Sequence, residues 1–247
     1  DRASAGPQTR SEPSLQALAA RKGLTFGSSA GMGAWGSLGG SLRDPGYQSI
    51  LVEQCGGLVC ENEMKWAALR PDQNSFDWRR ADTLAEFART HDMDLRGHTL
   101  LWHHPQWFPD WLTNHDFGSA PASEAARLVT DHVKAVCDRY PQIVSWDVVN
   151  EAVDADTGAL RDTSLSNAMG HGVIDLTFQI ARASAPNTQL LYNDYMSWEA
   201  GHEKHRAGVL RLLEGLVTRG VPIDGLGVQS HIGSGNTDQS VGFDTAQ

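Results

Sequence analysis

The apolar positions of the chain alternate between two spacings, one typical of strands and the other typical of helices. Short runs that begin with apolar residues and finish with polar ones recur along the chain, and they predict buried strands. These predicted strands cover residues 24–31, 58–65, 94–102, 143–151, 189–195 and 225–232. The segments between them are long, and several carry apolar residues at the three- and four-residue steps of an amphipathic helix.

The helical pattern is clearest over residues 123–140, where apolar residues recur from Ala125 to Tyr140 and Ser123 is the expected N-cap. Similar patterns predict helices over residues 78–91, 172–184 and 202–218. Strands separated by crossovers of this length must pair in parallel, which gives successive right-handed βαβ units.

This alternation predicts an α/β protein of the (β/α)8, or TIM, barrel class. We count six strands, so the chain supplies about six of the eight βα units that close such a barrel. We expect the polar residues 1–12 to form a disordered lead-in, and residues 13–247 to form one barrel domain that is incomplete at its C-terminus.

Polar residues gather where most of the predicted strands end. The clusters are ENEMK at 61–65, GHTLLWHH at 97–104, NE at 150–151, YNDY at 192–195 and QSH at 229–231. In a parallel barrel the carboxyl ends of all strands meet at one face, where barrel enzymes place their active sites. One such cluster could be a solvated strand end, but five at equivalent positions predict a functional site.

The strand that ends in WDVVNEA, residues 146–152, carries two acids. With the two-residue period of a strand, Asp147, Val149 and Glu151 share one face and Asn150 faces the other way. If the shared face is inward, Glu151 lies at the mouth of the barrel and Asp147 lies deeper. An acid at the mouth, beside apolar and aromatic side chains, is suited to donate a proton.

The ordered set of strand-end motifs resembles glycoside hydrolase family 10, the retaining endo-β-1,4-xylanases. The motifs are ENEMKW, GHTLLWH, WDVVNEA, LYNDY and GVQSH, and the resemblance extends from about residue 24 to residue 232. It implies a TIM-barrel hydrolase that cleaves xylan with two glutamates, one acting as acid/base and one as nucleophile. The implied partner is xylan or a xylo-oligosaccharide, and no cofactor or metal ion is expected.

The resemblance implies catalytic roles for three residues. Glu151 corresponds to the acid/base, which protonates the leaving glycosidic oxygen and later deprotonates the attacking water. Asn150 would bind the 2-hydroxyl of the sugar at the cleavage point, an interaction that strengthens in the transition state. His231 matches one member of a pair that orients the carboxylates, and the other member, Gln229, is also expected to contact the substrate.

Five further substrate-binding residues follow from the same resemblance. Glu61, Asn62 and Lys65 match residues that hold the sugar on the non-reducing side of the cleaved bond. His98 and Trp102 match residues that flank the sugar at the cleavage point, where the flat apolar face of Trp102 suits a pyranose ring. A structural role, as solvated rim or as core packing, stays open for each of these residues.

The family nucleophile is a Glu at the end of the seventh strand, and we find no counterpart for it between His231 and Gln247. Glu199 and Glu203 follow the fifth predicted strand and are interpreted as solvated charges at a helix start. We therefore expect little or no turnover by this chain alone, with the remaining strands supplied by a second chain, by a swapped protomer or by protein outside this sequence. The rival interpretation is a catalytically inactive xylan-binding fragment.

Composition narrows the choice of partners. The net charge of −10 argues against a nucleic-acid partner, because phosphates require clustered Lys and Arg. No apolar run approaches the ~18 residues of a membrane span. Three cysteines are too few for a disulfide scaffold, and we expect Cys55, Cys60 and Cys137 to be buried apolar side chains, with a Cys55–Cys60 bridge left open. Because xylan cannot enter cells, the resemblance implies a secreted protein, extracellular or periplasmic.

Three local patterns suggest other roles. Residues 31–36, GMGAWG, have the glycine spacing of a dinucleotide site, but no helical pattern opens there, so we expect a flexible loop. His202 and His205 lie three apart on a charged helix, where we expect them to be exposed, and they lack the H-E-x-x-H spacing of a zinc hydrolase. Trp107 and Trp111 either line a lengthened leaving-group groove or pack the long loop 103–122.

Overall fold

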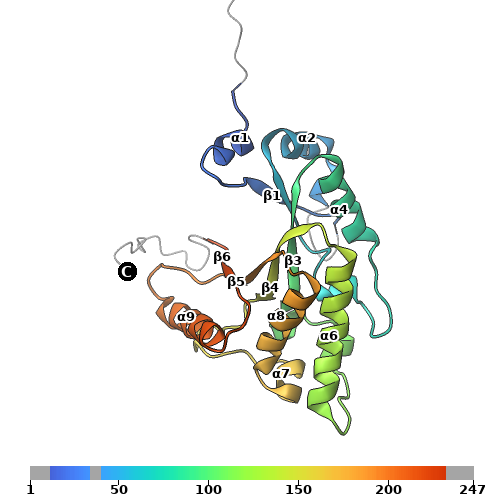
Figure 1. The fold of residues 1–247 in the computed structure, drawn as a ribbon, viewed down its shortest axis with the longest axis vertical. Coiled ribbons are helices and arrows are strands. Elements are labelled where there is room, and N and C mark those ends of the chain that lie inside the picture. The colour runs from blue at the N-terminus through green and yellow to red at the C-terminus, as the bar shows by residue number, and fades with distance from the viewer. Residues whose placement is uncertain (1–11, 34–39, 232–247) are drawn as a thin grey trace, which may run out of the picture.

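The structure is a computed structural model that describes residues 12–33 and 40–231. Its sheet contains six parallel strands, ordered in space as they are ordered in the chain (Figure 1). The strands are β1 (Gly27–Ala30), β2 (Gly57–Cys60), β3 (Asp94–Trp102), β4 (Ile143–Asn150), β5 (Gln189–Asp194) and β6 (Gly225–Val228). This topology is that of a partial (β/α)8 barrel, which confirms the predicted fold class.

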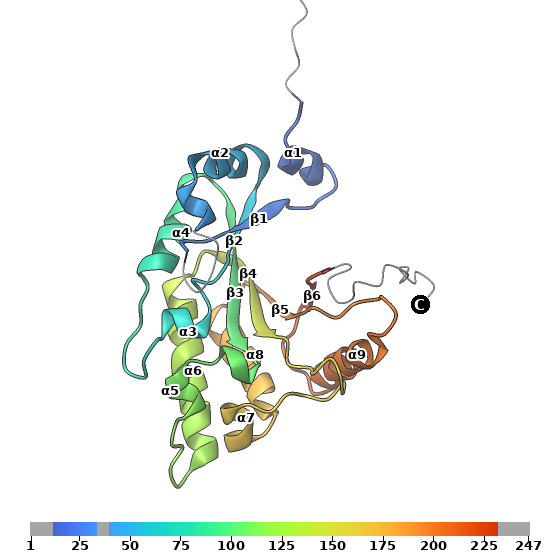
Figure 2. The same cartoon turned by 180° about the vertical axis from the view of Figure 1, so that it is seen from behind.

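Helices surround the outer side of the curved sheet, as Figures 1 and 2 show from opposite directions. They are α1 (Leu15–Ala20), α2 (Pro45–Gln54), α3 (Trp66–Leu69), α4 (Arg79–Thr90), α5 (Asp110–Thr113), α6 (Pro121–Arg139), α7 (Ser164–Met169), α8 (Gly172–Ser184) and α9 (Glu203–Thr218). Short 3-10 turns occur at Ser41–Arg43 and Pro105–Trp107. The four predicted helices correspond to α4, α6, α8 and α9.

Two helix starts differ from the prediction. Helix α6 begins at Pro121 after the N-cap Ala120, so the predicted cap at Ser123 is wrong. Proline suits the first helical position because its missing N–H would have no partner there and its φ is already helical. Helix α2 was not predicted, although Asp44 caps it by accepting hydrogen bonds from the backbone of Gly46 and Tyr47.

Some predicted segments lie outside the described residues. They are nearly all of the lead-in at 1–12, the second half of the glycine motif at 31–36 and the last residue of the predicted strand 225–232. The cysteines are free thiols: Cys60 and Cys137 are buried as predicted, Cys55 is half-buried, and the bridge between Cys55 and Cys60 is not formed.

The main core lies between the sheet and its helices. Strand β4 is buried at every position except Val144, and Trp146 is the largest side chain that is fully buried. Trp146 lies against Gly97 of β3, where a Cβ atom would be only 2.1 Å from the indole ring. The sheet can form this close pair because position 97 has no side chain.

Two buried histidines predict that acid destabilises the fold. Burial lowers the pKa of His103 to about 4, and burial also lowers the pKa of His132, stacked on Trp66, well below the ordinary 6.5. Between pH 6.5 and 4 the unfolded chain therefore binds more protons than the folded chain. The free energy of unfolding should fall as the pH falls through this window, by up to about 1.4 kcal/mol per pH unit for each histidine.

Urea unfolding at a series of pH values measures this slope. The variant His132→Phe preserves an aromatic ring in the stack but cannot titrate. Its free energy of unfolding should therefore fall less steeply with pH, by up to about 1.4 kcal/mol per pH unit. A free energy of unfolding that is constant from pH 7 to pH 4.5 would contradict the assignment of both histidines as neutral in the folded state.

Candidate active site

The predicted polar clusters lie together at the carboxyl end of the sheet. Glu61 follows β2, Trp102 ends β3, Glu151 follows β4, Asp194 ends β5 and Gln229 follows β6. Since all strands are parallel, these ends share one edge, which is the edge where barrel enzymes carry out their chemistry.

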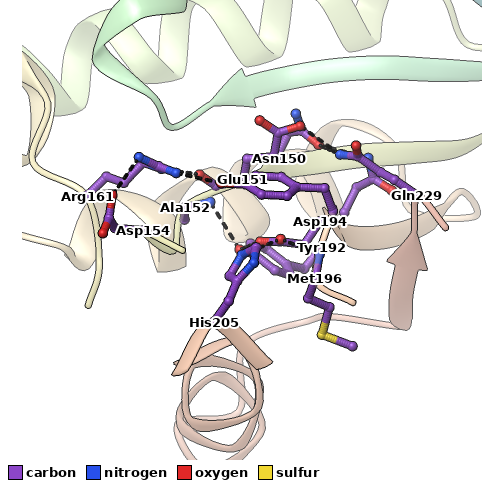
Figure 3. A network of polar contacts seen from close by, with 12 residues as sticks. Asn150, Glu151, Ala152, Asp154, Arg161, Tyr192, Asp194, Met196, His205 and Gln229 are labelled. Carbon is purple, nitrogen blue, oxygen red and sulfur yellow. Dashed lines mark hydrogen bonds and ion pairs between the residues drawn. The ribbon is translucent and has the colours of Figure 1, made fainter. Parts of the chain in front are cut away.

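Glu151 lies at the centre of this edge and is half-buried (Figure 3). Its Oε2 accepts a hydrogen bond of 2.9 Å from the indole Nε1 of Trp102, and its Oε1 accepts one of 2.7 Å from the Nε2 of Gln229. The two donors come from β3 and from the segment after β6. The direction of this carboxylate is therefore fixed from both sides.

Asn150 lies beside Glu151, which corrects the predicted arrangement of faces. The Oδ1 of Asn150 accepts hydrogen bonds from Asn193 at 2.8 Å and from the same Gln229 Nε2 at 3.4 Å. Strand β4 has a register shift against β5 between Asp147 and Val149, and Glu151 has a positive φ of 53°. The bulge breaks the two-residue period and the left-handed residue turns the chain, so Asn150 and Glu151 reach the same partner.

Asp147 is buried deeper in the barrel, as predicted, and is paired there. Its carboxylate accepts hydrogen bonds from the guanidinium of Arg96 and, at 2.9 Å, from Nδ1 of His98. A carboxylate only accepts when ionised, so the Nδ1 of His98 carries the proton. This pairing fixes the ring of His98 at the edge of Trp102, with ring centroids 6.1 Å apart.

Trp102, which donates to Glu151, is flanked by Lys65 and by a second tryptophan. The Nζ of Lys65 donates to Asn62 Oδ1 at 2.8 Å and lies 4.7 Å from the ring centroid of Trp102. Burial lowers the pKa of Lys65, while the charges of Glu151, Glu63 and Glu61 oppose this shift. Trp107 stacks on Trp102 with centroids 4.9 Å apart.

The two tryptophans of loop 103–122 thus have different positions. Trp107 stacks on Trp102, whereas Trp111 packs the loop, its Nε1 donating to the carbonyl of Arg70 at 2.9 Å. Trp111 therefore packs the loop, whereas a leaving-group groove lined by Trp107 stays a prediction.

Glu63 is a site residue that sequence reasoning missed. Glu61, which was predicted, accepts a hydrogen bond of 3.0 Å from Ser41. Glu63 is only 2% exposed, and its carboxylate accepts from the backbone N–H groups of Met32 and Asn62 at 2.6 and 3.0 Å. It therefore ties the loop after β2 to the loop after β1. Nothing in the residue types of ENEMK distinguishes these two glutamates.

Two histidines near the site differ in exposure. His231 is exposed, and its Nε2 lies 3.1 Å from the Oε1 of Gln229, so its link to Glu151 runs through that amide. His205, which was expected to be exposed, is fully buried, with its Nε2 2.8 Å from a carboxylate oxygen of Asp194. The prediction for His205 is wrong because a charged helix sequence does not reveal which of its polar side chains meets a buried acid.

Neither a membrane helix nor a metal cluster occurs in the parts of the chain that the structure describes. No helix within residues 12–33 and 40–231 has the length and apolar character to cross a bilayer. Across the same ranges, no group of three or more His, Cys, Asp or Glu side chains is arranged to hold a metal ion.

Comparison with known proteins places this geometry in a family. The sequence profile of glycosyl hydrolase family 10 matches residues 14–245. Endo-1,4-beta-xylanase 1 of Gibberella zeae is 36% identical over 198 residues, which cover 79% of this chain and 54% of that protein. Endo-1,4-beta-xylanase 3 of Hypocrea jecorina is 33% identical over 231 residues, which cover 93% of this chain and 62% of that protein.

Solved structures of xylanases resemble this chain in fold as well. Xylanase 10B of Thermotoga petrophila, in complex with xylobiose, superposes with a TM-score of 0.78 at 29% identity, covering 90% of this chain and 64% of that one. Native xylanase 10B of Thermotoga maritima superposes with a TM-score of 0.76 at 30% identity, covering 87% and 63%. The chain thus spans somewhat more than half the length of the relatives that it matches. The chain belongs to glycosyl hydrolase family 10.

Proposed function

We propose that the whole protein is a secreted, retaining endo-1,4-β-xylanase in which Glu151 is the acid/base. The observation that carries the proposal is the carboxylate of Glu151, fixed by Trp102 and Gln229 at the carboxyl end of the barrel strands. Relatives with 33–36% identity are named endo-1,4-beta-xylanases, and related structures hold xylobiose and xylotriose. A secreted location follows from the size of the proposed polymeric substrate.

In this mechanism Glu151 first protonates the glycosidic oxygen as the bond breaks, and later removes a proton from the attacking water. Asn150 is suited to the neighbouring hydroxyl, because its side chain is buried and its Nδ2 donor has no hydrogen-bond partner among the described residues. A hydrogen bond from this amide to the 2-hydroxyl would strengthen as positive charge develops on the sugar ring.

The residues around Glu151 offer the groups that a neutral sugar needs. Trp102 and Trp107 provide flat apolar surface, while Lys65 and His98 provide polar atoms at the rim of Trp102. Protein sites that bind uncharged small molecules combine largely apolar walls with a few placed polar groups. Recognition of xylose hydroxyls by Glu61, Asn62 and Gln229 completes the proposal for the substrate site.

A retaining mechanism also needs a nucleophilic carboxylate about 5–5.5 Å from the acid/base. We propose that a Glu from protein beyond this sequence supplies it, on strands that complete the barrel. In the described residues, β1 pairs only with β2 and β6 pairs only with β5, so each strand has a free edge. Apolar side chains lie exposed near both edges, among them Leu24 at 61% and Val228 at 39%.

The test uses the full-length protein and β-1,4-xylan. Release of reducing ends measures cleavage, and proton NMR during the first minutes identifies the anomer formed. The proposal predicts internal cleavage with the β-anomer formed first. An inactive xylan-binding protein would bind xylo-oligosaccharides without releasing reducing ends, and initial formation of the α-anomer would contradict the retaining mechanism.

A further inference from the structure

Three buried polar side chains form a chain that begins at the peptide bond following Glu151 (Figure 3). Tyr192 and Asp194 belong to β5, and His205 belongs to α9. The side chains of all three residues are 0% exposed. Buried polar groups are costly unless each is paired, so this arrangement requires a structural or functional reason.

The hydrogen bonds of this chain have a fixed direction. The backbone N–H of Ala152 donates to the phenol oxygen of Tyr192 at 3.0 Å, and the phenol O–H donates to Oδ2 of Asp194. The other oxygen of Asp194 accepts from the backbone N–H of Met196 at 3.0 Å and lies 2.8 Å from Nε2 of His205. A phenol has one hydrogen, and Tyr192 donates it in the hydrogen bond to Asp194. The lone pairs of the phenol oxygen therefore accept the hydrogen bond from Ala152.

The Tyr192 phenol stays protonated in this environment. Burial raises its pKa well above 10, and the negative charge of Asp194 raises it further. A neutral phenol is the form that can donate to Asp194 and accept from Ala152 at the same time.

These side chains hold the backbone at Glu151 in an unfavourable conformation. Glu151 has a φ of 53°, in the left-handed region that a residue with a Cβ atom rarely adopts. Such a conformation persists where neighbouring groups over-determine it. Its N–H donates to the carbonyl of Asn193 at 2.9 Å, its carbonyl accepts from Arg161 Nε at 3.2 Å, and the next N–H is the one held by Tyr192.

Asp194 is also linked to the carboxylate of Glu151 indirectly, through Gln229. Its backbone carbonyl accepts from the backbone N–H of Gln229 at 3.0 Å, and the side chain of Gln229 donates to Glu151 Oε1 at 2.7 Å. One residue thus fixes both the peptide on the C-terminal side of Glu151 and a hydrogen-bond donor to its carboxylate.

We propose that Tyr192, Asp194 and His205 are positioning residues that hold the left-handed Glu151, and so aim its carboxylate at the leaving-group oxygen. The inference rests on the proposed function and deepens it, because it assigns α9 a part in proton transfer through His205. None of the three needs to touch the substrate.

The variant Tyr192→Phe tests the proposal, because it removes one oxygen and preserves the buried ring. With the full-length protein, kcat/KM on xylotriose should fall about tenfold, since a misdirected acid transfers its proton less well. On a dinitrophenyl β-xylobioside, whose leaving group needs no proton, kcat/KM reports formation of the covalent intermediate and should change less than about twofold. An equal fall on the two substrates, or no fall on either, would overturn the proposal.

Tyr140→Phe is the matched control. Tyr140 is also buried, and its phenol donates to a carboxylate, that of Asp82, at 3.1 Å. It precedes β4 at the opposite end of the strand from Glu151. Tyr140→Phe removes the same kind of hydrogen bond far from Glu151, so the ratio of the two kcat/KM values should remain that of the unmodified protein.

Substitution of His205 separates its polar contact with Asp194 from its packing. His205→Gln keeps a polar side chain beside Asp194 and should preserve the ratio of the two kcat/KM values, whereas His205→Leu should lower it as Tyr192→Phe does. If His205→Leu keeps the ratio of the unmodified protein, α9 plays no part in positioning Glu151.

Amide hydrogen exchange gives a readout that does not depend on activity. In Tyr192→Phe the N–H of Ala152 loses its acceptor, so its exchange should become at least about tenfold faster, while exchange in β3 should be unchanged. If the unmodified protein cleaves neither substrate, the proposed function fails and this measurement still decides the positioning proposal. Unchanged exchange at Ala152 would refute it.

Discussion

Glu151→Ala should abolish xylan cleavage by the full-length protein while largely sparing the first step, formation of the covalent intermediate, on substrates with activated leaving groups. General acid catalysis contributes about 10²–10⁴-fold to a rate, and we expect a loss in this range on the polymer. A dinitrophenolate leaves without a proton, so formation of the covalent intermediate from an aryl glycoside should survive the substitution. Reducing-end release from xylan measures the loss, and the initial burst and kcat/KM of dinitrophenolate release measure the spared first step.

Glu86→Ala is the control for this experiment. Glu86 is a surface residue on α4, 61% exposed and paired with Arg89. Glu86→Ala removes one carboxylate, as Glu151→Ala does, but outside the candidate active site. The control variant should match the unmodified protein on both substrates. An equal loss of kcat/KM on polymer and aryl glycoside in Glu151→Ala would contradict the acid role, because only the polymer needs a proton for its leaving group.

Gly97→Ala should strongly destabilise the fold. A Cβ atom at position 97 would lie 2.1, 2.2 and 2.5 Å from three ring atoms of Trp146. The indole is fully buried and has no room to move, so the strands β3 and β4 must separate. Overpacking of this kind costs about 1–3 kcal/mol or more, a large part of the roughly 5–15 kcal/mol that stabilises a typical domain. Urea unfolding of the variant measures the loss.

Two comparisons make this prediction specific. Gly172→Ala, at the start of α8, adds a Cβ atom with nothing within 4 Å, so it should be neutral or slightly stabilising. Adding Trp146→Leu to Gly97→Ala should recover part of the lost stability, because the two positions are in contact and their effects are coupled. Strictly additive losses would show that the clash with Trp146 is not the cause.

The sequence predicts the fold and the edge that carries the site, because both follow from periodicity. Strand β3 occupies the predicted residues 94–102, where the apolar run is long, whereas β1 is shorter than predicted. The strand-end clusters meet because parallel strands place all carboxyl ends together. These features depend on local pattern and on the rules of strand connection.

Other features depend on contacts that no local pattern encodes. Asn150 and Glu151 turn to one side because of a bulge set by the pairing of β4 with β5 and because of a left-handed residue held by distant groups. His205 is buried because Asp194 lies beneath α9, and the charged neighbours of His205 in the sequence conceal this. Glu63 differs from Glu61 only in the backbone amides that fold onto it.

The central claim is that Glu151 is the acid/base of a retaining mechanism, and azide rescue of Glu151→Ala tests it most directly. In this variant the covalent intermediate forms from a dinitrophenyl β-xylobioside but lacks the base that activates water, and azide needs no such base. Our account predicts that azide accelerates turnover and yields the β-xylobiosyl azide. An α-configured azide product, or no acceleration by azide, would contradict it.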